Sequence, residues 1–275
     1  MIRLVALDVD GTLLDSHGQI PSANLDALHA AAAAGLHLVV VTGRSYPFAL
    51  PAVRDLPDPL TVCVYNGAVA RVRGGDTLVR HTLSGLIARD VLVHTRAWRA
   101  ATTVQFDREH GQTLFDELSW DHPNRRGYYA KVRHHVSQVA DLEAAMDEDD
   151  PVQVAFNGPT AEMRALYDVL ATHPGLTSLS VSATHYPSRD FSLVDVNAAG
   201  ATKSGALAAI AARLGVARDE VFAIGDNHND IDMLQWAGTG VVMGNAEPEL
   251  LALGLPIAPS NDEAGLAAAL RQFVL

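Results

Sequence analysis

Short apolar runs that end at small or polar residues alternate with helix-like stretches near both ends of this chain of 275 residues. This alternation is typical of βαβ units around a mostly parallel sheet. We therefore predict an α/β fold with a doubly wound, mostly parallel sheet. The expected strands cover residues 2–7, 36–41, 61–65, 221–224 and 240–243, and an alanine-rich helix is expected over 22–34, closed by Gly35.

The middle of the chain has a different pattern, because it is more polar and holds most of the 12 histidines. Gly74 and Gly75 indicate a hairpin that leads out of the first part of the chain. We expect an inserted α/β domain over residues 84–189, within a core domain formed by 1–83 and 190–275. In the insert we expect helices over 86–98, 136–146 and 161–173, and strands over 102–106, 128–133 and 152–156.

The charge balance limits the classes of partner. The chain has 20 Lys and Arg residues against 32 Asp and Glu residues, a formal net charge of −12. Such a chain lacks the basic surface that attracts nucleic acid or an anionic bilayer, and its longest basic run is Arg125-Arg126. We therefore expect neither partner, and no pattern indicates an oligomeric state. Taken alone, the charge also disfavours a phosphorylated substrate.

Three features of the sequence indicate where in the cell the protein is located. No apolar stretch approaches the roughly 20 residues that a membrane span requires. Asp8 and Asp10 stand where a signal peptide would continue its apolar core. Cys63 alone cannot form an internal disulfide, which fits a reducing compartment. We expect a soluble, cytoplasmic protein.

Polar residues follow the ends of the expected strands. In open α/β sheets, ligands bind beyond the carboxyl ends of the strands, so these residues should converge. Two like charges about 4 Å apart repel by roughly 4 kcal/mol at an effective dielectric near 20, so a cation must lie among them. Oxygen ligands suit Mg²⁺, which bridges carboxylates to phosphate and reverses the expectation from net charge. The set is Asp8, Asp10, Thr42, Asn66, Asp226 and Asp230, with Lys203 opening a later helix.

The segment Asp8-Val9-Asp10-Gly11-Thr12 resembles the first motif, D-x-D-x-T, of the haloacid dehalogenase superfamily of phosphohydrolases. The other motifs follow in order. Thr42-Gly43-Arg44 resembles the second, Lys203 the third, and the segment from Gly225-Asp226 to Asp230 the fourth. The insertion between the second and third motifs, Asn66-Gly67-Ala68 and Val242-Met243-Gly244-Asn245-Ala246 resemble the Cof-type subgroup, which carries a large α/β cap.

The resemblance implies roles for the carboxylates. Asp8 would be the nucleophile that forms an aspartyl-phosphate, and an ordinary pKa of about 3.9 would keep it ionised. Asp10 would be the general acid, and its backbone carbonyl would bind Mg²⁺. The implied metal-binding set is Asp8, Asp10, Asp226 and Asp230, the last directly or through water.

The resemblance also implies phosphate contacts. Thr42 would donate its hydroxyl to the phosphoryl group, although it could instead cap a helix, and Lys203 would offset negative charge. Asn66 and Asn229 could equally be turn residues. The implied catalytic set is Asp8, Asp10, Thr42 and Lys203, and the implied phosphate-binding set is Gly43, Arg44, Asn66 and Asn229.

We expect a Mg²⁺-dependent phosphatase for a small phosphorylated metabolite: a sugar phosphate, a nucleotide or a cofactor phosphate. A phosphomutase of the same superfamily and, from another class, a receiver-like signalling protein that accepts a phosphoryl group remain alternatives. Specificity should reside in the inserted cap, which would close over the leaving group. The candidate contacts there, each with cap packing as its alternative, are Trp120, Tyr128, Tyr129, His185 and Arg189.

Overall fold

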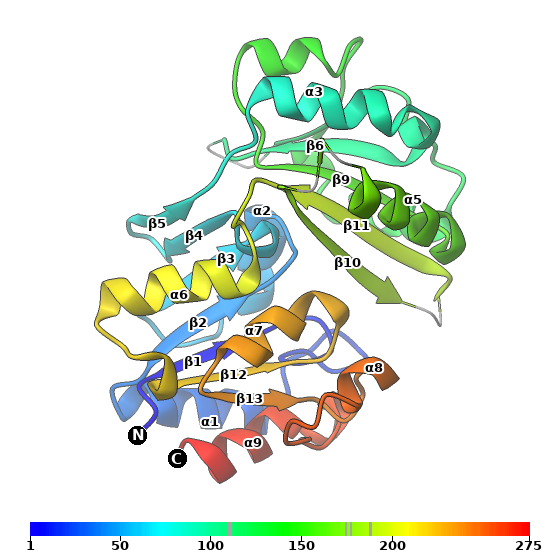
Figure 1. Cartoon of the computed structure of the whole chain (residues 1–275). Coiled ribbons are helices and arrows are strands. Elements are labelled where there is room, and N and C mark those ends of the chain that lie inside the picture. The colour runs from blue at the N-terminus through cyan, green and yellow to red at the C-terminus, as the bar shows by residue number, and fades with distance from the viewer. Residues whose placement is uncertain (109–111, 174, 177, 187–188) are drawn as a thin grey trace. The chain divides into compact units, whose positions relative to one another are not determined.

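The computed structural model describes residues 1–108, 112–173, 175–176, 178–186 and 189–275. Figure 1 shows the chain, which divides into two compact units. The larger unit comprises Met1–Arg44, Ala49–Arg80 and Thr202–Leu275, and the smaller unit comprises Ser45–Phe48 and His81–Ala201.

The larger unit contains a seven-stranded sheet with the order β13-β12-β1-β2-β3-β4-β5. Strands from β13 to β3 are parallel, and β4 and β5 are added as an antiparallel hairpin, which confirms the mostly parallel sheet and the hairpin. The strands are β1 Leu4–Leu7, β2 His37–Val41, β3 Leu60–Val64, β4 Val69–Val72, β5 Thr77–Arg80, β12 Val221–Gly225 and β13 Thr239–Val242.

Helices cover both faces of this sheet (Figure 1). On one face, Leu4 and Ala6 of β1 pack with Leu207 of α6 and Met233 of α7. These two helices also contact each other. On the other face, α1 contacts α9. Burial from both sides explains why every residue of β1 is apolar. The helices of this unit are α1 Ser22–Ala33, α6 Lys203–Leu214, α7 Ile231–Trp236, α8 Pro248–Leu251 and α9 Gly265–Phe273. The short helix α2, Tyr46–Ala49, has its first three residues in the smaller unit.

The smaller unit contains a six-stranded sheet with the order β10-β11-β9-β6-β7-β8. Its neighbouring strands are antiparallel, except that β7 and β8 run parallel. Its core includes Leu92, Phe106, Phe156 and Leu166. The strands are β6 Thr102–Phe106, β7 Gln112–Phe115, β8 Val136–Gln138, β9 Gln153–Gly158, β10 Ser180–Tyr186 and β11 Phe191–Asn197, and the helices are α3 Gly85–His94, α4 Pro123–Ala130 and α5 Thr160–Thr172.

Two elements predicted in the middle of the chain are wrong. The expected strand over residues 128–133 is the end of α4 and the turn after it, because Pro123 starts a helix that His122 caps by accepting a bond from the Asn124 amide. The expected helix over 136–146 is the short strand β8, followed by irregular chain and a turn of 3₁₀ helix at Ala144–Asp147. The helix expected over 86–98 ends at His94.

The strand after residue 190 also differs from expectation. We assigned residues from 190 onward to the second segment of the core domain, but β11 pairs with β9 and β10 of the smaller sheet. The larger unit therefore resumes at Thr202 and not at residue 190. The strands β7 and β10 had no counterpart in the sequence prediction.

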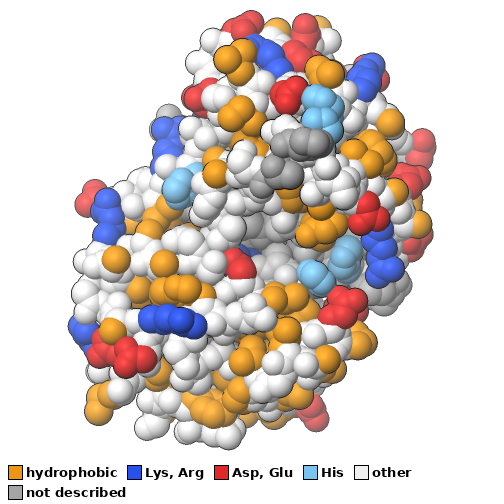
Figure 2. Space-filling model, viewed as in Figure 1, with side chains coloured by type: hydrophobic (Ala, Val, Ile, Leu, Met, Phe, Trp, Pro, Cys, Tyr) orange, Lys and Arg blue, Asp and Glu red, His pale blue; other side chains and the backbone are white. Residues whose placement is uncertain are grey.

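Acidic and basic side chains are interspersed on the face that Figure 2 shows, without a separate basic area among the side chains coloured there. Among the described residues, no helix is both long and apolar enough for a membrane span.

Candidate active site

The polar residues predicted at strand ends lie at one edge of the larger sheet. Asp8 follows β1, Thr42 follows β2, Asn66 lies just beyond β3, and Asp226 follows β12. These four strands are neighbours in the order β12-β1-β2-β3 and run parallel, so the residues leave the sheet side by side. The sheet topology therefore brings residues that are far apart in the sequence into one cluster.

Three carboxylates form the centre of this cluster. Asp8, Asp226 and Asp230 are buried, and each offers an oxygen within 4.8 Å of the others. This group could hold a metal ion. The side chain of Asp10, which we expected beside them, lies outside the group.

Lys203 supplies a positive charge inside the cluster. Its Nζ donates to Asp8 Oδ1 and to Asp230 Oδ1, each at 2.6 Å, and its side chain is only 1% exposed. Burial alone would lower the pKa of Lys203, but Asp230 and Asp8 outweigh burial and raise it above its usual value. The ammonium therefore stays charged and fixes the orientation of both carboxylates.

The start of α6 places this lysine. Thr202 caps the helix, because its Oγ1 accepts a hydrogen bond of 3.0 Å from the Gly205 amide. The carboxylate of Asp232 accepts from the Ser204 amide at 2.9 Å. These two bonds satisfy the backbone amides of Ser204 and Gly205 in the first helical turn. They thereby hold Lys203 at the first position of the helix.

Asp230 is held by the loop that precedes it. Its Oδ2 accepts from the amides of Asp226 and Asn227, at 3.1 and 2.9 Å. The fit is tight, because a Cβ on Gly225 would lie 2.5 Å from the Asp230 carboxyl carbon. These contacts place Asp226 and Asp230 together.

Asp226 is oriented by two residues of the first motif that we did not predict as site residues. Thr12 Oγ1 donates to Asp226 Oδ1 at 2.9 Å. Gly11 has a φ of +83°, and a Cβ there would lie 2.2 Å from Asp226 Oδ2. The T of the D-x-D-x-T pattern was the sequence signal that could have identified Thr12.

Burial changes the ionisation of the carboxylates. The pKa of Asp8 rises to about 7, chiefly because the side chain is desolvated, with Lys203 opposing the rise and Asp230 and Asp10 adding to it. Desolvation and the charges of Asp8 and Asp230 also raise the pKa of Asp226 well above its usual value. The expected ordinary pKa for Asp8 is therefore wrong. Three carboxylates around one ammonium leave an excess of negative charge, which a hard cation with oxygen ligands would offset.

Asp10 and Arg44 form a pair of their own. Arg44 donates from Nε to Asp10 Oδ2 at 2.7 Å and from its terminal nitrogen to Oδ1 at 2.6 Å. The Arg44 amide also donates to Thr42 Oγ1 at 3.2 Å. The residue expected to contact phosphate and the residue expected to act as the acid therefore hold each other through two hydrogen bonds.

Asn66 connects three parts of the site. Its backbone amide donates to the Thr42 carbonyl at 3.1 Å, and its side-chain Oδ1 accepts from Asn229 Nδ2 at 2.9 Å. The residue has a φ of +52°, and Gly67 after it has a φ of +106° and lies against the Thr202 carbonyl, where a Cβ would come within 2.1 Å. A Cβ on Gly43 would lie 3.0 Å from Asn66 Oδ1. The turn after β3 thus packs against the loops that carry Thr42, Lys203 and Asn229.

A sequence model of the haloacid dehalogenase-like hydrolases matches residues 5–270 of the chain. The chain belongs to this family. The match spans both units and confirms the predicted superfamily, its Cof-type subgroup and the enzyme class.

Known proteins resemble this hydrolase along its whole length. The putative phosphatase YxeH of Bacillus subtilis is 28% identical over 298 residues, which cover 100% of this chain and 99% of that protein. The 5-amino-6-(5-phospho-D-ribitylamino)uracil phosphatase YcsE of the same organism is 27% identical, covering 100% and 96%. The solved structure of the phosphatase BT1666 from Bacteroides thetaiotaomicron has 28% identity and a TM-score of 0.79, covering 99% and 95%. These likenesses confirm the α/β fold.

The residues that we expected to contact substrate in the insert all lie in the smaller unit but in different surroundings. Trp120 and Tyr129 line one pocket, and Tyr128 packs edge-on against Phe48 at 5.0 Å. His185 Nδ1 is 2.9 Å from Ser192 Oγ, and the Arg189 guanidinium lies 5.9 Å from the Tyr186 ring centroid. The pocket thus brings Trp120 and Tyr129 together.

Proposed function

We propose that this hydrolase is a Mg²⁺-dependent phosphatase that releases phosphate from a small phosphorylated metabolite through an aspartyl-phosphate on Asp8. The observation that carries the proposal is the buried group of Asp8, Asp226 and Asp230 around Lys203. A carboxylate fixed beside an ammonium and a metal-binding carboxylate is suited to attack a phosphoryl group, since charge neutralisation supplies most of the catalysis in such transfers.

The chemistry uses Asp8 and Asp10 in two steps. An oxygen of Asp8 bonds to phosphorus while the bond between phosphorus and the leaving oxygen breaks, and Asp10 gives that oxygen a proton. Water then bonds to phosphorus and gives a proton to Asp10, and the bond to Asp8 breaks. Both carboxylate oxygens of Asp10 accept from Arg44, so this pair would open when Asp10 gives its proton to the leaving oxygen.

The oxygen donors fit Mg²⁺. Asp8 and Asp226 would hold the ion, with Asp230 binding directly or through water and with the Asp10 backbone carbonyl as a further ligand. When bound, the ion supplies positive charge that offsets the charge of the phosphoryl group. Lys203 would add positive charge beside Asp8 in the same way.

Three further residues of this edge would bind the phosphoryl oxygens. Thr42 would donate its hydroxyl, Gly43 its amide, and Arg44 its guanidinium once Asp10 is released. Asn66 and Asn229 hold each other through one bond and would keep this loop in place beside the phosphate. We assign no contact with substrate to them.

The substrate would be a small cytoplasmic metabolite, selected by the smaller unit as a cap. Relatives named for pyridoxal phosphate in Escherichia coli and for a ribitylamino-uracil phosphate in B. subtilis suggest heteroaromatic phosphates as the first compounds to assay. The match to a hydrolase family over residues 5–270 gives no support to a receiver-like protein. A phosphomutase would return an isomerised phosphate, which the assay below detects.

The test is a phosphate-release screen of sugar phosphates, nucleotides and cofactor phosphates, with Mg²⁺ and with EDTA. We expect turnover with Mg²⁺, loss with EDTA and recovery when Mg²⁺ is restored. Borohydride added during turnover should reduce the acyl-phosphate and leave homoserine at position 8, which peptide mass spectrometry detects. Turnover in EDTA, an isomerised product without phosphate release, or turnover without any homoserine would each contradict part of the proposal.

A further inference from the structure

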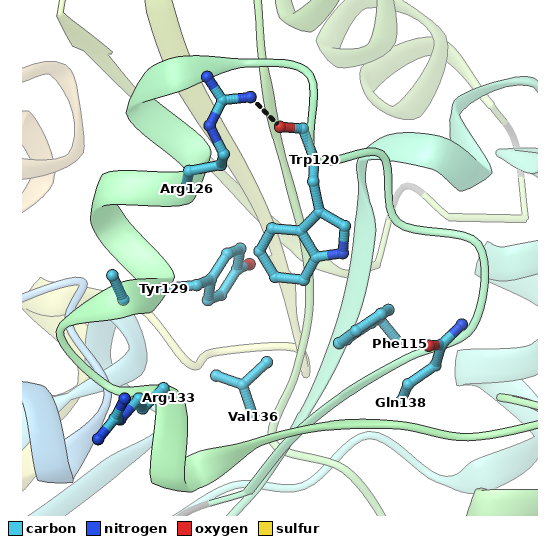
Figure 3. Close-up of a pocket in the computed structure, with 8 residues that line it drawn as sticks. Phe115, Trp120, Arg126, Tyr129, Arg133, Val136 and Gln138 are labelled. Carbon is cyan, nitrogen blue, oxygen red and sulfur yellow. Dashed lines mark hydrogen bonds between the residues drawn. The ribbon is translucent and has the colours of Figure 1, made fainter.

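A pocket of about 300 Å³ lies within the smaller unit, where α4, β7 and β8 meet (Figure 3). Phe115 ends β7, Tyr129 lies on α4, Val136 begins β8, and Trp120 lies in the loop between β7 and α4. Protein pockets for small molecules begin at about this volume and have mainly apolar walls with a few polar groups. The size and walls of this pocket therefore fit a small ligand.

The Trp120 indole makes edge-to-face contacts with two other aromatic rings. Its ring centroid lies 5.4 Å from that of Phe115 and 5.8 Å from that of Tyr129, with an interplanar angle of 81° in both pairs. These edge-to-face contacts fix the indole. The residue nevertheless remains 39% exposed, so the fold does not cover Trp120 completely.

The Tyr129 wall is fixed as well. The residue is buried, and its hydroxyl accepts a bond of 3.0 Å from Asn157 Nδ2 and lies 3.3 Å from Thr103 Oγ1. The phenol is thereby anchored to the strands β6 and β9. A ligand would meet preformed walls, which lowers the entropy lost on binding.

The charged residues at this pocket are both basic. Arg126 and Arg133 line it, and none of its lining residues is acidic. Across the described parts of the chain, neither guanidinium forms an ion pair with a carboxylate. Arg126 donates to the Trp120 carbonyl at 2.6 Å, as the dashed line in Figure 3 shows, and to the Asp121 carbonyl at 3.2 Å. Arg133 lies near Val136 and donates from Nε to the His134 ring at 3.4 Å.

The combination selects one class of ligand. Aromatic walls alone would also suit an organic cation, but two arginines in a pocket with no acidic lining residue disfavour cations. Two basic residues at one pocket are notable in a chain with a net charge of −12. An anionic group can pair with Arg133 while a flat ring lies against Trp120.

We propose that this pocket binds a planar aromatic or heteroaromatic ring that carries an anionic group, with the ring against Trp120 and the anionic group paired with Arg133. The ring could belong to the leaving group of the substrate or to a separate effector, and the recognition chemistry is the same for both. Only the first source rests on the proposed phosphatase function, and the pocket itself does not.

The test is calorimetric titration of the full chain with 2-naphthoate. The controls are cyclohexanecarboxylate, which lacks the ring, and 2-naphthylmethylammonium, which reverses the charge. We expect 2-naphthoate to bind at least about tenfold more tightly than either control, and Arg133→Gln to weaken it about tenfold. Arg164→Gln, an exposed arginine on α5 of the same unit, should bind like the wild type.

Nuclear magnetic resonance locates the ligand and checks folding. The indole N–H signal of Trp120 should shift on titration, while those of Trp98 and Trp236 should not, and the spectrum of Arg133→Gln should remain that of a folded protein. Absence of 2-naphthoate binding, equal binding of the ammonium compound, or unchanged binding by Arg133→Gln would overturn the proposal.

Kinetics then separate the two sources. If the ring belongs to the substrate, 2-naphthoate competes with an aromatic phosphate ester, and Arg133→Gln raises KM for that ester with little change in kcat. If the ring belongs to an effector, 2-naphthoate binds without competing. Both results support the pocket. An absence of phosphatase activity would contradict the proposed function and leave the calorimetric result to decide the pocket.

Discussion

The two sheets bury their polar side chains in different places. In the larger sheet, the strand β1 is wholly apolar, and Asp8 follows directly after it, as Asp226 follows β12. In the smaller sheet, buried polar residues lie within the strands. Gln105 donates to Gln153 at 2.9 Å, and Gln153 donates to Asn197 at 3.2 Å, across β6, β9 and β11.

The difference follows from strand direction. Parallel strands deliver their carboxyl ends to one edge, so polar residues gather there with donors and acceptors left for a ligand. In the antiparallel sheet, the amides of Gln105, Gln153 and Asn197 lie side by side and bond to one another, and Asn197 donates onward to the Val152 carbonyl. We infer that polar residues serve chemistry in the first sheet and stability in the second.

The largest effect is expected from Asp8→Asn. An amide cannot serve as the nucleophile, so kcat should fall about 10⁴-fold or more. The free energy of unfolding should fall by less than about 1 kcal/mol, because the change removes a carboxylate that burial disfavours. Phosphate release and urea unfolding measure the two quantities. Asp26→Asn, on the exposed side of α1, is the control. Retained turnover by Asp8→Asn would contradict the inference that the polar residues of the larger sheet serve chemistry.

Lys203→Met should reduce stability as well as activity. The change leaves Asp8 and Asp230 buried without their shared partner, which should lower the free energy of unfolding by about 3–5 kcal/mol in EDTA. Added Mg²⁺ should recover part of this loss, because it restores positive charge. Urea unfolding with and without Mg²⁺ measures both effects, with the exposed Lys131→Met as the control. An equal loss in both conditions would argue against a metal at this group.

Gly11→Ala should separate site geometry from backbone strain. Gly11 and Gly18 both have positive φ values, +83° and +75°, so alanine should cost each about 1 kcal/mol of stability. Only at Gly11 would the new Cβ meet Asp226, and a displacement of that carboxylate should lower kcat about 100-fold. Gly18→Ala, which meets nothing within 4 Å, should keep wild-type kcat. Equal kcat for the two variants would be the contrary result.

Gln153→Ala, in the smaller sheet, should reduce stability more than activity. It leaves Gln105 and Asn197 without their shared partner, so the free energy of unfolding should fall by about 1–3 kcal/mol. The kcat should change less than about tenfold, because the reacting groups lie in the larger unit. Fluorescence of Trp98 and Trp120 reports unfolding of the smaller unit, and Gln272→Ala, at an exposed glutamine on α9, is the control. A larger loss of kcat would show that the amides contact substrate.

The smallest effect concerns pH. Partial burial alone would raise the pKa of Asp116, but the bonds from Arg99 outweigh it and hold the pKa below its usual value. The stabilisation is therefore complete above the ordinary pKa and is lost as pH falls through the lowered one. Asp116→Asn should cost about 1 kcal/mol at pH 7, and the difference from wild type should shrink below about pH 4. A difference that stays constant with pH would exclude the ion pair as its cause.

The fold of the larger unit was predictable because its signals are local. Apolar runs next to Asp8, Thr42 and Asn66 mark both the strands and the positions where they end. The order of the motifs then brings Lys203 and Asp226 to the same edge. These inferences need only the chain pattern and the rule that parallel strands share an edge.

The smaller unit was less predictable because tertiary contacts decide its elements. The aromatic and β-branched residues over 128–133 favour a strand, yet the segment continues a helix in which Arg125 is buried and donates to Asn157 Oδ1 at 2.7 Å. The strand β8 exists because Val136 pairs with Thr113 of β7, a contact that no local pattern reveals. Tertiary pairing thus overrode local propensity.

The details of the site were also beyond the sequence. The pKa of Asp8 depends on how completely the fold excludes water from it, and composition gives no measure of that. The pairing of Asp10 with Arg44 depends on side-chain direction at two adjacent strand ends. Residue type and order predicted which groups meet, but not how they are paired.

The place of β1 in its sheet has a consequence for synthesis. The strand lies between β2, which follows soon after it, and β12, where Leu4 pairs with Val221. A ribosome completes the smaller unit before it makes Lys203, Asp226 or β12, so until then one edge of β1 lacks its partner. Under the proposed mechanism, a nascent chain therefore carries Asp8 long before Lys203 and Asp226, and the proposed site is complete only when the segment from Thr202 onward closes the sheet.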